Sequence, residues 1–388
     1  MKKEIFLYKC FVLFLIFCPH VVSCATKPLH IFFVVGRFPS PSQIFVLNMI
    51  TGLIDRGHKV SIFSFHKDPR INMHSNIKKY NLLKHVIYKK FPDKLPKCDI
   101  VFCQFGHLAQ KIFEMPHLSD WLKHKQVVVC LRGVDITSHL QEDPHRYKRI
   151  LKQAKLFLPV CDYFKQKLIA LGCKKSKIVV HHSAIDCSQF SFTPRSKPKN
   201  NQINFVSVCR LVKKKGLDIA LKAFEQIVRK YPQAHYFIVG DGPERTYLKL
   251  LVYQLNLQDN VTFCGWKSHE EITSILNKSH IFMLPSKKVH DGNEEGIPNA
   301  LKEAMAMGLI SIGTWHAGTP ELIDHGISGF LVPEHSVIEL VNNIDYIIEH
   351  PEMWEFIGLA ARKKIENEFE TKKSVEQLEK LFYGLLEQ

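Results

Sequence analysis

The apolar positions in the first half of the chain form short continuous runs, which alternate with longer segments of helical spacing. Continuous apolar runs are typical of strands that are buried on both faces of a parallel sheet. The expected strands are residues 30–35, 59–65, 99–103, 126–131, 156–160 and 177–181. A segment of helical period, residues 43–56, separates the first two strands. This strand–helix–strand order predicts a parallel sheet with helices on both faces.

The same alternation restarts in the second half of the chain. The expected strands are residues 203–209, 234–239, 261–263, 281–284 and 310–314, and the expected helices are 216–230, 243–255, two that start at His269 and Pro298, 337–348, 351–369 and 371–386. Between the halves, residues 191–202 read SFTPRSKPKNNQ, which is polar, aperiodic and typical of a linker. We therefore predict an α/β protein with two Rossmann-like domains that face a central cleft, where the carboxyl ends of the strands bind ligands.

The pattern divides the chain into five parts. They are an apolar leader or anchor segment at 1–25, an N-terminal domain at 26–190, the linker at 191–202, a C-terminal domain at 203–365, and a C-terminal helix at 366–388 that we expect to pack back on the N-terminal domain. A chain of 388 residues is long enough for two domains with full cores. A hydrophobic content of 46% and a charged content of 23% are globular values, so they exclude a largely disordered chain.

The first 25 residues carry conflicting signals about location. Lysines precede an apolar run at residues 10–18, and VSCA at residues 22–25 resembles a signal or lipoprotein cleavage site. The run is too short for a membrane span, and the chain has eleven scattered cysteines, as a cytosolic chain can. We favour an uncleaved leader or peripheral anchor on a cytoplasmic protein at the inner face of the membrane, with export as the alternative. No cysteine has zinc-ligand spacing, so we expect no metal site.

The formal net charge of +16 indicates an anionic partner. Residues 67–97 hold nine Lys or Arg against two Asp, and such a basic flank favours contact with an anionic membrane surface. A nucleic-acid-binding protein is a distant alternative, because basic and aromatic residues are not interleaved and no reader module is recognisable.

Residues 291–308 read DGNEEGIPNALKEAMAMG and predict a loop that leads into a short helix. Glu295 lies in the loop and Glu303 on the helix, Pro298 suits the first helical turn, and Gly308 ends the helix. The free N–H groups of a helix N-terminus suit a phosphate. Two glutamates near a helix start are equally typical of a solvated helix face, so this pattern alone is weak.

A second basic pattern follows the expected strand 203–209. Arg210 ends this strand and Lys215 opens the next helix, where a guanidinium and an ammonium suit phosphate oxygens. A basic loop on a basic protein is the alternative. The turn Gly240-Asp-Gly-Pro is expected to line the cleft, and Trp266 either packs or lies near a nucleotide base.

Together these motifs resemble the retaining GT-B glycosyltransferases of family four. They are residues 210–216, 240–243, 263–266, 284–286 and 295–308, in this order and spacing. In the N-terminal half, residues 36–40, 104–106, 132–135 and 181–186 are most similar to the colanic-acid and amylovoran exopolysaccharide branch. The resemblance implies a hexosyltransferase of polysaccharide biosynthesis, which moves a sugar from a nucleoside-diphosphate sugar to a glycan or lipid-linked acceptor with retention and without a cofactor or bound metal.

The resemblance also implies roles for individual residues. Arg210 and Lys215 would hold the donor diphosphate and, with Glu295 on the transferred sugar, form the catalytic group. Glu303 would bind the ribose. The wider donor-binding set comprises Glu303, Gly296, Ile297, Pro298, Asn299, Ala300, Trp266 and Gly36.

Two departures from the family concern the acceptor side. Many members have His where this chain has Arg132, and arginine is no base at neutral pH. We assign Arg132 to sugar or phosphate binding, or to an ion pair with Asp135. Asp135 and His107 complete the acceptor or sugar side, with His182 as a further candidate, and each histidine also suits a structural role. The second departure is Gly36, where many members have two glycines.

A sugar-nucleotide epimerase, which shares this fold, is the alternative enzyme.

Overall fold

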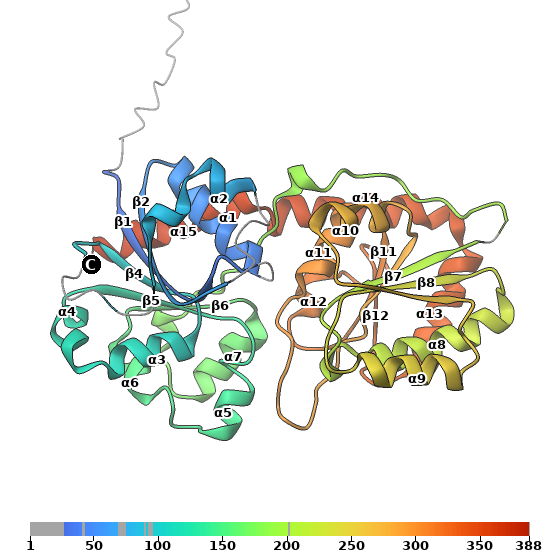
Figure 1. The fold of residues 1–388 in the computed structure, drawn as a ribbon, viewed down its shortest axis with the longest axis horizontal. Helices are drawn as coiled ribbons and strands as arrows, with labels where there is room; N and C mark the ends of the chain where they lie inside the picture. Colours follow the sequence, from blue (N-terminus) through green and yellow to red (C-terminus); the bar gives the residue numbers. More distant parts are fainter. Residues whose placement is uncertain are drawn as a thin grey trace, which may run out of the picture.

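The computed structural model describes residues 27–40, 43–68, 75–88, 91, 96–200 and 202–387. The leader or anchor expected at residues 1–25 lies outside this part. Within it, the chain folds into two α/β domains, which Figure 1 shows side by side. None of the helices in the described ranges combines the length and apolar character needed to cross a membrane.

The N-terminal domain contains a six-stranded parallel sheet among its described residues, in the order β3-β2-β1-β4-β5-β6. Its strands are β1 (His30–Phe38), β2 (Lys59–Lys67), β3 (Val86–Tyr88), β4 (Ile100–Cys103), β5 (Gln126–Leu131) and β6 (Leu156–Pro159). Its helices are α1 (Ile44–Asp55), α2 (Ser75–Lys79), α3 (Gly106–Glu114), α4 (Ser119–Lys123), α5 (Ser138–Glu142), α6 (Lys148–Gln153) and α7 (Asp162–Ala170). The order reverses between β1 and β4, so the carboxyl ends of these strands flank the crevice where such sheets bind ligands.

The C-terminal domain repeats this design among its described residues, in the parallel order β12-β11-β10-β7-β8-β9. Its strands are β7 (Asn204–Val208), β8 (His235–Val239), β9 (Val261–Gly265), β10 (Ile281–Met283), β11 (Ile310–Thr314) and β12 (Phe330–Val332). Its helices are α8 (Leu217–Lys230), α9 (Arg245–Gln254), α10 (His269–Asn277), α11 (Asn299–Ala306), α12 (Thr319–Leu322), α13 (Val337–Glu349) and α14 (Trp354–Glu368), and α15 (Thr371–Leu386) follows. The predicted fold class of two Rossmann-like domains is confirmed.

Three details of the sequence prediction are wrong. Residues 177–181 form no strand, because a 3-10 turn at Lys175–Lys177 leaves only an isolated bridge between Phe157 and Ile178. The short edge strands β3 and β12 were missed. Strand β1 continues to Phe38, so Gly36 lies within the strand instead of in the loop after it.

Two segments cross between the domains. Helix α15 returns to the N-terminal domain and packs against α1, where Glu379 contacts Arg56 and His58 (Figure 1). Residues 191–200 form neither helix nor strand, but Arg195 is buried and donates to the Asn277 carbonyl over 2.7 Å. The expected linker is therefore bound to the C-terminal domain through Arg195.

Candidate active site

The carboxyl end of β7 presents two of the expected cations. Arg210 is exposed, and its guanidinium has no hydrogen-bond or ion-pair partner among the residues that the structure describes. Lys215 ends a 3-10 turn, and Gly216 follows in the left-handed conformation with φ 66°. A Cβ on Gly216 would lie 1.9 Å from the Pro285 carbonyl oxygen. Only glycine permits this approach, which fixes Lys215 at the sheet edge.

Two lysines surround the carboxylate of Glu295. Lys215 Nζ lies 2.6 Å and Lys214 Nζ 3.7 Å from Glu295 Oε2. Burial alone would raise the pKa of Glu295, but the two ammonium groups outweigh it and hold this pKa at about 2. Lys214 also donates to Asn293 Oδ1 over 3.0 Å. The sequence prediction missed Lys214, since nothing in the run of three lysines at 213–215 distinguishes it.

His316 and Glu334 hold the loop that carries Glu295. The main-chain N–H of Glu295 donates to His316 Nε2 over 3.1 Å, so the ring proton belongs on Nδ1, which lies 2.8 Å from Glu334 Oε1. The other oxygen of Glu334 accepts the N–H of Lys288 over 2.7 Å. The Glu334 carboxylate thus holds both ends of the loop at 288–295, directly at Lys288 and through His316 at Glu295. The sequence analysis overlooked both residues, although each follows the carboxyl end of a C-terminal strand (β11 or β12).

Helix α11 presents free main-chain donors next to this cluster. It begins at Asn299, and Pro298 stands before it in an extended conformation (ψ 126°), one position earlier than its expected place in the first turn. The N–H groups of Gly296, Asn299 and Ala300 make no hydrogen bond within the described part of the chain. Ile297 is buried, and no side chain caps the helix. Such unsatisfied donors suit phosphate oxygens.

Glu303 and Lys302 are adjacent on α11 and differ in their partners. The Lys302 ammonium is buried and donates to the Ser183 carbonyl of the N-terminal domain and to Asn299 Oδ1. Burial, together with nearby Arg132, lowers the pKa of Lys302 to about 7. The Glu303 carboxylate makes no hydrogen bond or ion pair with a described residue, and burial raises its pKa to about 7 although Lys302 opposes this. Glu303 is therefore free to accept hydroxyl groups of a ligand.

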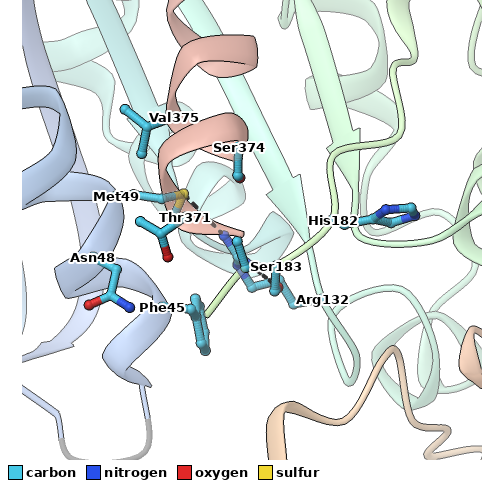
Figure 2. A pocket seen from close by; sticks show the side chains of 10 residues that line it. Phe45, Asn48, Met49, Arg132, His182, Ser183, Thr371, Ser374 and Val375 are labelled. Carbon is cyan, nitrogen blue, oxygen red and sulfur yellow. Dashed lines mark hydrogen bonds between the residues drawn. The ribbon is translucent and has the colours of Figure 1, made fainter. Parts of the chain in front are cut away.

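The side chain of Arg132 contacts other residues of its own, N-terminal domain. Its guanidinium donates to Ser183 Oγ over 2.7 Å and to Gln104 Oε1 over 3.0 Å, and it lies 4.3 Å from the ring centre of Phe45. Figure 2 shows it between α1 and the first turn of α15, in a cavity of about 10 Å³ that holds about one water molecule. The considered ion pair with Asp135 does not form, because only the main-chain N–H of Arg132 donates to that carboxylate.

Asp135 is buried, and the chain itself uses its carboxylate. It accepts the main-chain N–H groups of Gly106, Arg132 and Gly133 over 2.9–3.0 Å. Asp135 therefore fixes the loops after β4 and β5, and the expected sugar contact finds no support in this geometry. The ring of His107 lies 5.3 Å from that of His139, and burial lowers the pKa of His107.

The remaining expected residues make no hydrogen bond or ion pair with the Glu295 cluster in the described part of the chain. Trp266 follows β9 at the same sheet edge with 49% of its surface exposed. A Cβ on Gly36 would meet only Leu108, at an ordinary 3.7 Å, so packing does not require glycine there. His182 forms a 3.1 Å contact with Glu321 of α12, which joins the two domains.

The two domains meet at their functional loops. A Cβ on Gly296 would lie 3.0 Å from Val160 and 3.1 Å from the Arg132 carbonyl oxygen, so this glycine permits close contact with the N-terminal domain. The loop that carries Arg132 and the loop that carries Glu295 are therefore in contact where the two domains meet. Among the described residues, no group of three or more His, Cys, Asp or Glu side chains could hold a metal ion.

Two facing Rossmann-like domains, with cations and a helix N-terminus at the inner edge of the second, define the GT-B fold. The fold matches Anabaena HepE in complex with UDP (TM-score 0.74, 18% identity, 92% of this chain and 100% of that chain). It also matches a glycosyltransferase from Rickettsia africae ESF-5 (TM-score 0.72, 18% identity, 93% and 99%).

Sequence comparison identifies the family. Residues 189–364 match the model of glycosyl transferases group 1. The amylovoran biosynthesis glycosyltransferase AmsK of Erwinia amylovora is 32% identical over 404 residues, which cover 90% of this chain and 98% of AmsK. WcaL of Escherichia coli (strain K12), assigned to colanic acid biosynthesis, is 29% identical over 386 residues (86% and 94%). The chain belongs to the group 1 glycosyltransferases, and the resemblance to the amylovoran and colanic-acid branch is confirmed.

Proposed function

We propose that this protein is a retaining hexosyltransferase of exopolysaccharide biosynthesis that moves a sugar from a nucleoside-diphosphate sugar to a glycan or lipid-linked acceptor. The observation that carries the proposal is the ion pair of Lys215 with Glu295 beside the free N–H groups at the start of α11, with the guanidinium of Arg210, unpaired among the described residues, at the carboxyl end of β7. HepE has been solved with UDP and with UDP-glucose, and the name of AmsK places it in amylovoran biosynthesis. Both support a sugar-nucleotide donor and a polysaccharide product here.

The proposed chemistry depends on neutralising the leaving diphosphate. Arg210 and Lys215 contact the phosphates, and the N–H groups at the start of α11 add further donors, so the developing charge meets groups that are already in place. Glu303 accepts hydroxyl groups of the ribose, while Glu295 contacts the transferred sugar and keeps Lys215 in position. The acceptor hydroxyl attacks from the face that the diphosphate leaves, and a departing phosphate oxygen takes its proton. No metal is needed for these steps.

A donor library tests this proposal. The purified protein is screened by thermal shift with nucleoside diphosphates and their sugars, and the stabilising donor is then incubated with candidate acceptors. We expect donor-dependent transfer, with the anomeric configuration retained in the product as read by nuclear magnetic resonance. Turnover of the donor without any acceptor would instead identify an epimerase, and an inverted product would overturn the retaining mechanism.

The location proposal is a cytoplasmic enzyme at an anionic membrane surface. Lys67, Lys78, Lys79, Lys84 and Lys97 are exposed on the N-terminal domain, and such a basic flank attracts acidic lipid headgroups. Co-sedimentation with vesicles of increasing anionic lipid content is expected to show binding that falls with salt. Absence of binding at every lipid composition would contradict the membrane part and leave the transferase part standing.

A further inference from the structure

A cavity of about 320 Å³ lies between the two domains, on the side of the Glu295 loop that faces the N-terminal domain. The lining residues that matter below are Leu140, Lys167, Leu171, Lys288, Gly292 and Glu294. Helices α5 and α7, with the residues that flank them, form the N-terminal wall, and the loop at 288–294 forms the other. The volume is at the lower end of the range of about 300–1,000 Å³ for small-molecule sites, which suits one sugar ring better than an extended chain.

The lining combines an apolar floor with charged groups around one buried carboxylate. Leu140 and Leu171 contribute to the floor. Glu294 is 2% exposed, and it lies 3.2 Å from Lys167 and 3.4 Å from Lys288. Burial would raise the pKa of Glu294, but a hydrogen bond from Tyr163 and the two lysines lower it below its ordinary value. Lys167 and Lys288, whose side chains are 31% and 62% exposed, therefore keep ammonium donors accessible at the wall of the cavity.

The loop that closes the cavity is the loop that carries Glu295. The Glu294 carbonyl accepts a hydrogen bond from Lys214 Nζ over 3.2 Å, and Lys214 in turn lies beside Glu295. Gly292 approaches α5 so closely that a Cβ, which its φ of 70° also disfavours, would lie 1.7 Å from Gln141 Oε1. A ligand in the cavity therefore contacts one face of a short loop whose last residue belongs to the donor cluster.

We propose that this cavity is an acceptor subsite for one sugar residue that bears an anionic group, a carboxylate or a phosphate. The C–H face of the ring packs on the apolar floor, hydroxyl groups donate to Glu294, and the anion meets Lys167 and Lys288. A pocket with an apolar lining and few convergent polar groups is the usual form of a small-molecule site. This inference rests on the proposed glycosyltransferase function and specifies its acceptor.

The test is calorimetric titration of the full-length protein whose donor site has first been filled with UDP or GDP, whichever binds. The probes are glucuronate, glucose 1-phosphate, glucose and inorganic phosphate. We expect saturable binding of glucuronate or glucose 1-phosphate at least tenfold tighter than that of glucose or inorganic phosphate. Preference for glucuronate assigns a carboxylate to the acceptor sugar, and preference for glucose 1-phosphate assigns a phosphate.

Two variants locate the binding. Lys167→Gln combined with Lys288→Gln is expected to remove the preference for the anionic sugar, and Leu140→Trp, which fills the cavity, to weaken every sugar probe at least tenfold. Both variants should bind the nucleoside diphosphate as the unmodified protein does. Equal binding of glucose and anionic sugars, binding unchanged in the lysine variant, or no saturable sugar binding beside normal nucleotide binding would overturn the subsite. If neither UDP nor GDP binds, the donor site is filled with the nucleoside diphosphate found by thermal shift, and failure of every nucleoside diphosphate to bind would instead overturn the proposed donor site.

Discussion

The carboxyl edges of the two sheets use their polar groups in opposite ways. At the N-terminal edge, the Asp135 carboxylate accepts three main-chain N–H groups, and the Arg132 guanidinium donates to Ser183 and Gln104. At the C-terminal edge, Arg210 and Glu303 have no partner within the described residues. Buried polar groups need hydrogen-bond partners, so the Glu303 carboxylate is a candidate for ligand contact, and the exposed guanidinium of Arg210 is free to make one. Asp135 and Arg132 thus hold the loops of the first edge, while Arg210 and Glu303 leave the second edge open to the proposed donor.

Lys215→Ala is expected to have the largest effect on ligand binding. Removing the ammonium deletes a charge-assisted contact to the diphosphate, worth about 1.5–3 kcal/mol or about 10–100-fold in affinity. The measurement is calorimetric titration with the nucleoside diphosphate found by thermal shift. Lys213 lies in the same turn and is exposed, so Lys213→Ala is the matched control and should bind normally. Equal affinities of the two variants would remove Lys215 from the donor site.

Asp135→Asn tests the other edge, where we expect lost stability and unchanged nucleotide affinity. The amide keeps the shape of the carboxylate, but its single oxygen replaces two charged acceptors, and its NH2 group faces a main-chain N–H as a second donor. The expected loss is about 2–4 kcal/mol in the free energy of unfolding of the N-terminal domain, measured by urea denaturation. A variant of ordinary stability that no longer transfers sugar would instead place Asp135 in contact with the substrate.

Glu334→Gln probes how the Glu295 loop is held. The variant keeps one acceptor for the Lys288 N–H but can turn its amide toward His316, which disturbs the hydrogen bond to the Glu295 N–H. A loosened Glu295 should lower kcat about tenfold, since small misplacements reduce catalysis strongly. The KM for the donor should change less, because Arg210 and Lys215 remain. A raised KM with an unchanged kcat would contradict this positioning role.

The sequence predicted most of the fold because buried parallel strands are continuous apolar runs, as in 30–35 and 310–314. It missed β3 and β12, since three-residue edge strands carry too little pattern. At 177–181, which read KIVVH, it failed because a short apolar run cannot show that an edge segment leaves the sheet. These errors lie at the borders of the sheets, where hydrophobic pattern is least informative.

For the site, the sequence indicates candidate residues where local order is enough, and it does not show contacts between distant residues. Arg210, Lys215 and Glu295 were recognisable from motifs with fixed spacing. The contact of Glu334 with Lys288, 46 residues away, and that of Lys302 with Ser183, 119 residues away, depend on tertiary structure. The same holds for Asp135, whose motif position suggested a substrate contact and whose burial shows a main-chain role.

The smallest expected effect is a pH dependence at α11. The pKa of Glu303 is raised to about 7, so the folded protein holds this proton more tightly than the unfolded chain, and stability falls as pH rises from about 4.5 to 7. The pKa of Lys302 is lowered to about 7, so its charged form is disfavoured, and its contribution makes stability rise between about pH 7 and 10.5. The two contributions therefore occupy separate pH windows.

Glu303→Gln separates these contributions and tests the ribose contact. The variant should lose the fall in stability between pH 4.5 and 7 and keep the rise above pH 7, as read from denaturation midpoints. Nucleoside-diphosphate affinity of the unmodified protein should increase a few-fold from pH 6 to 8, because an ionised carboxylate accepts hydroxyl groups more strongly. The variant should bind more weakly and show a flat profile over this range. A variant with the affinity and pH profile of the unmodified protein would show that Glu303, like Asp135, does not touch the ligand.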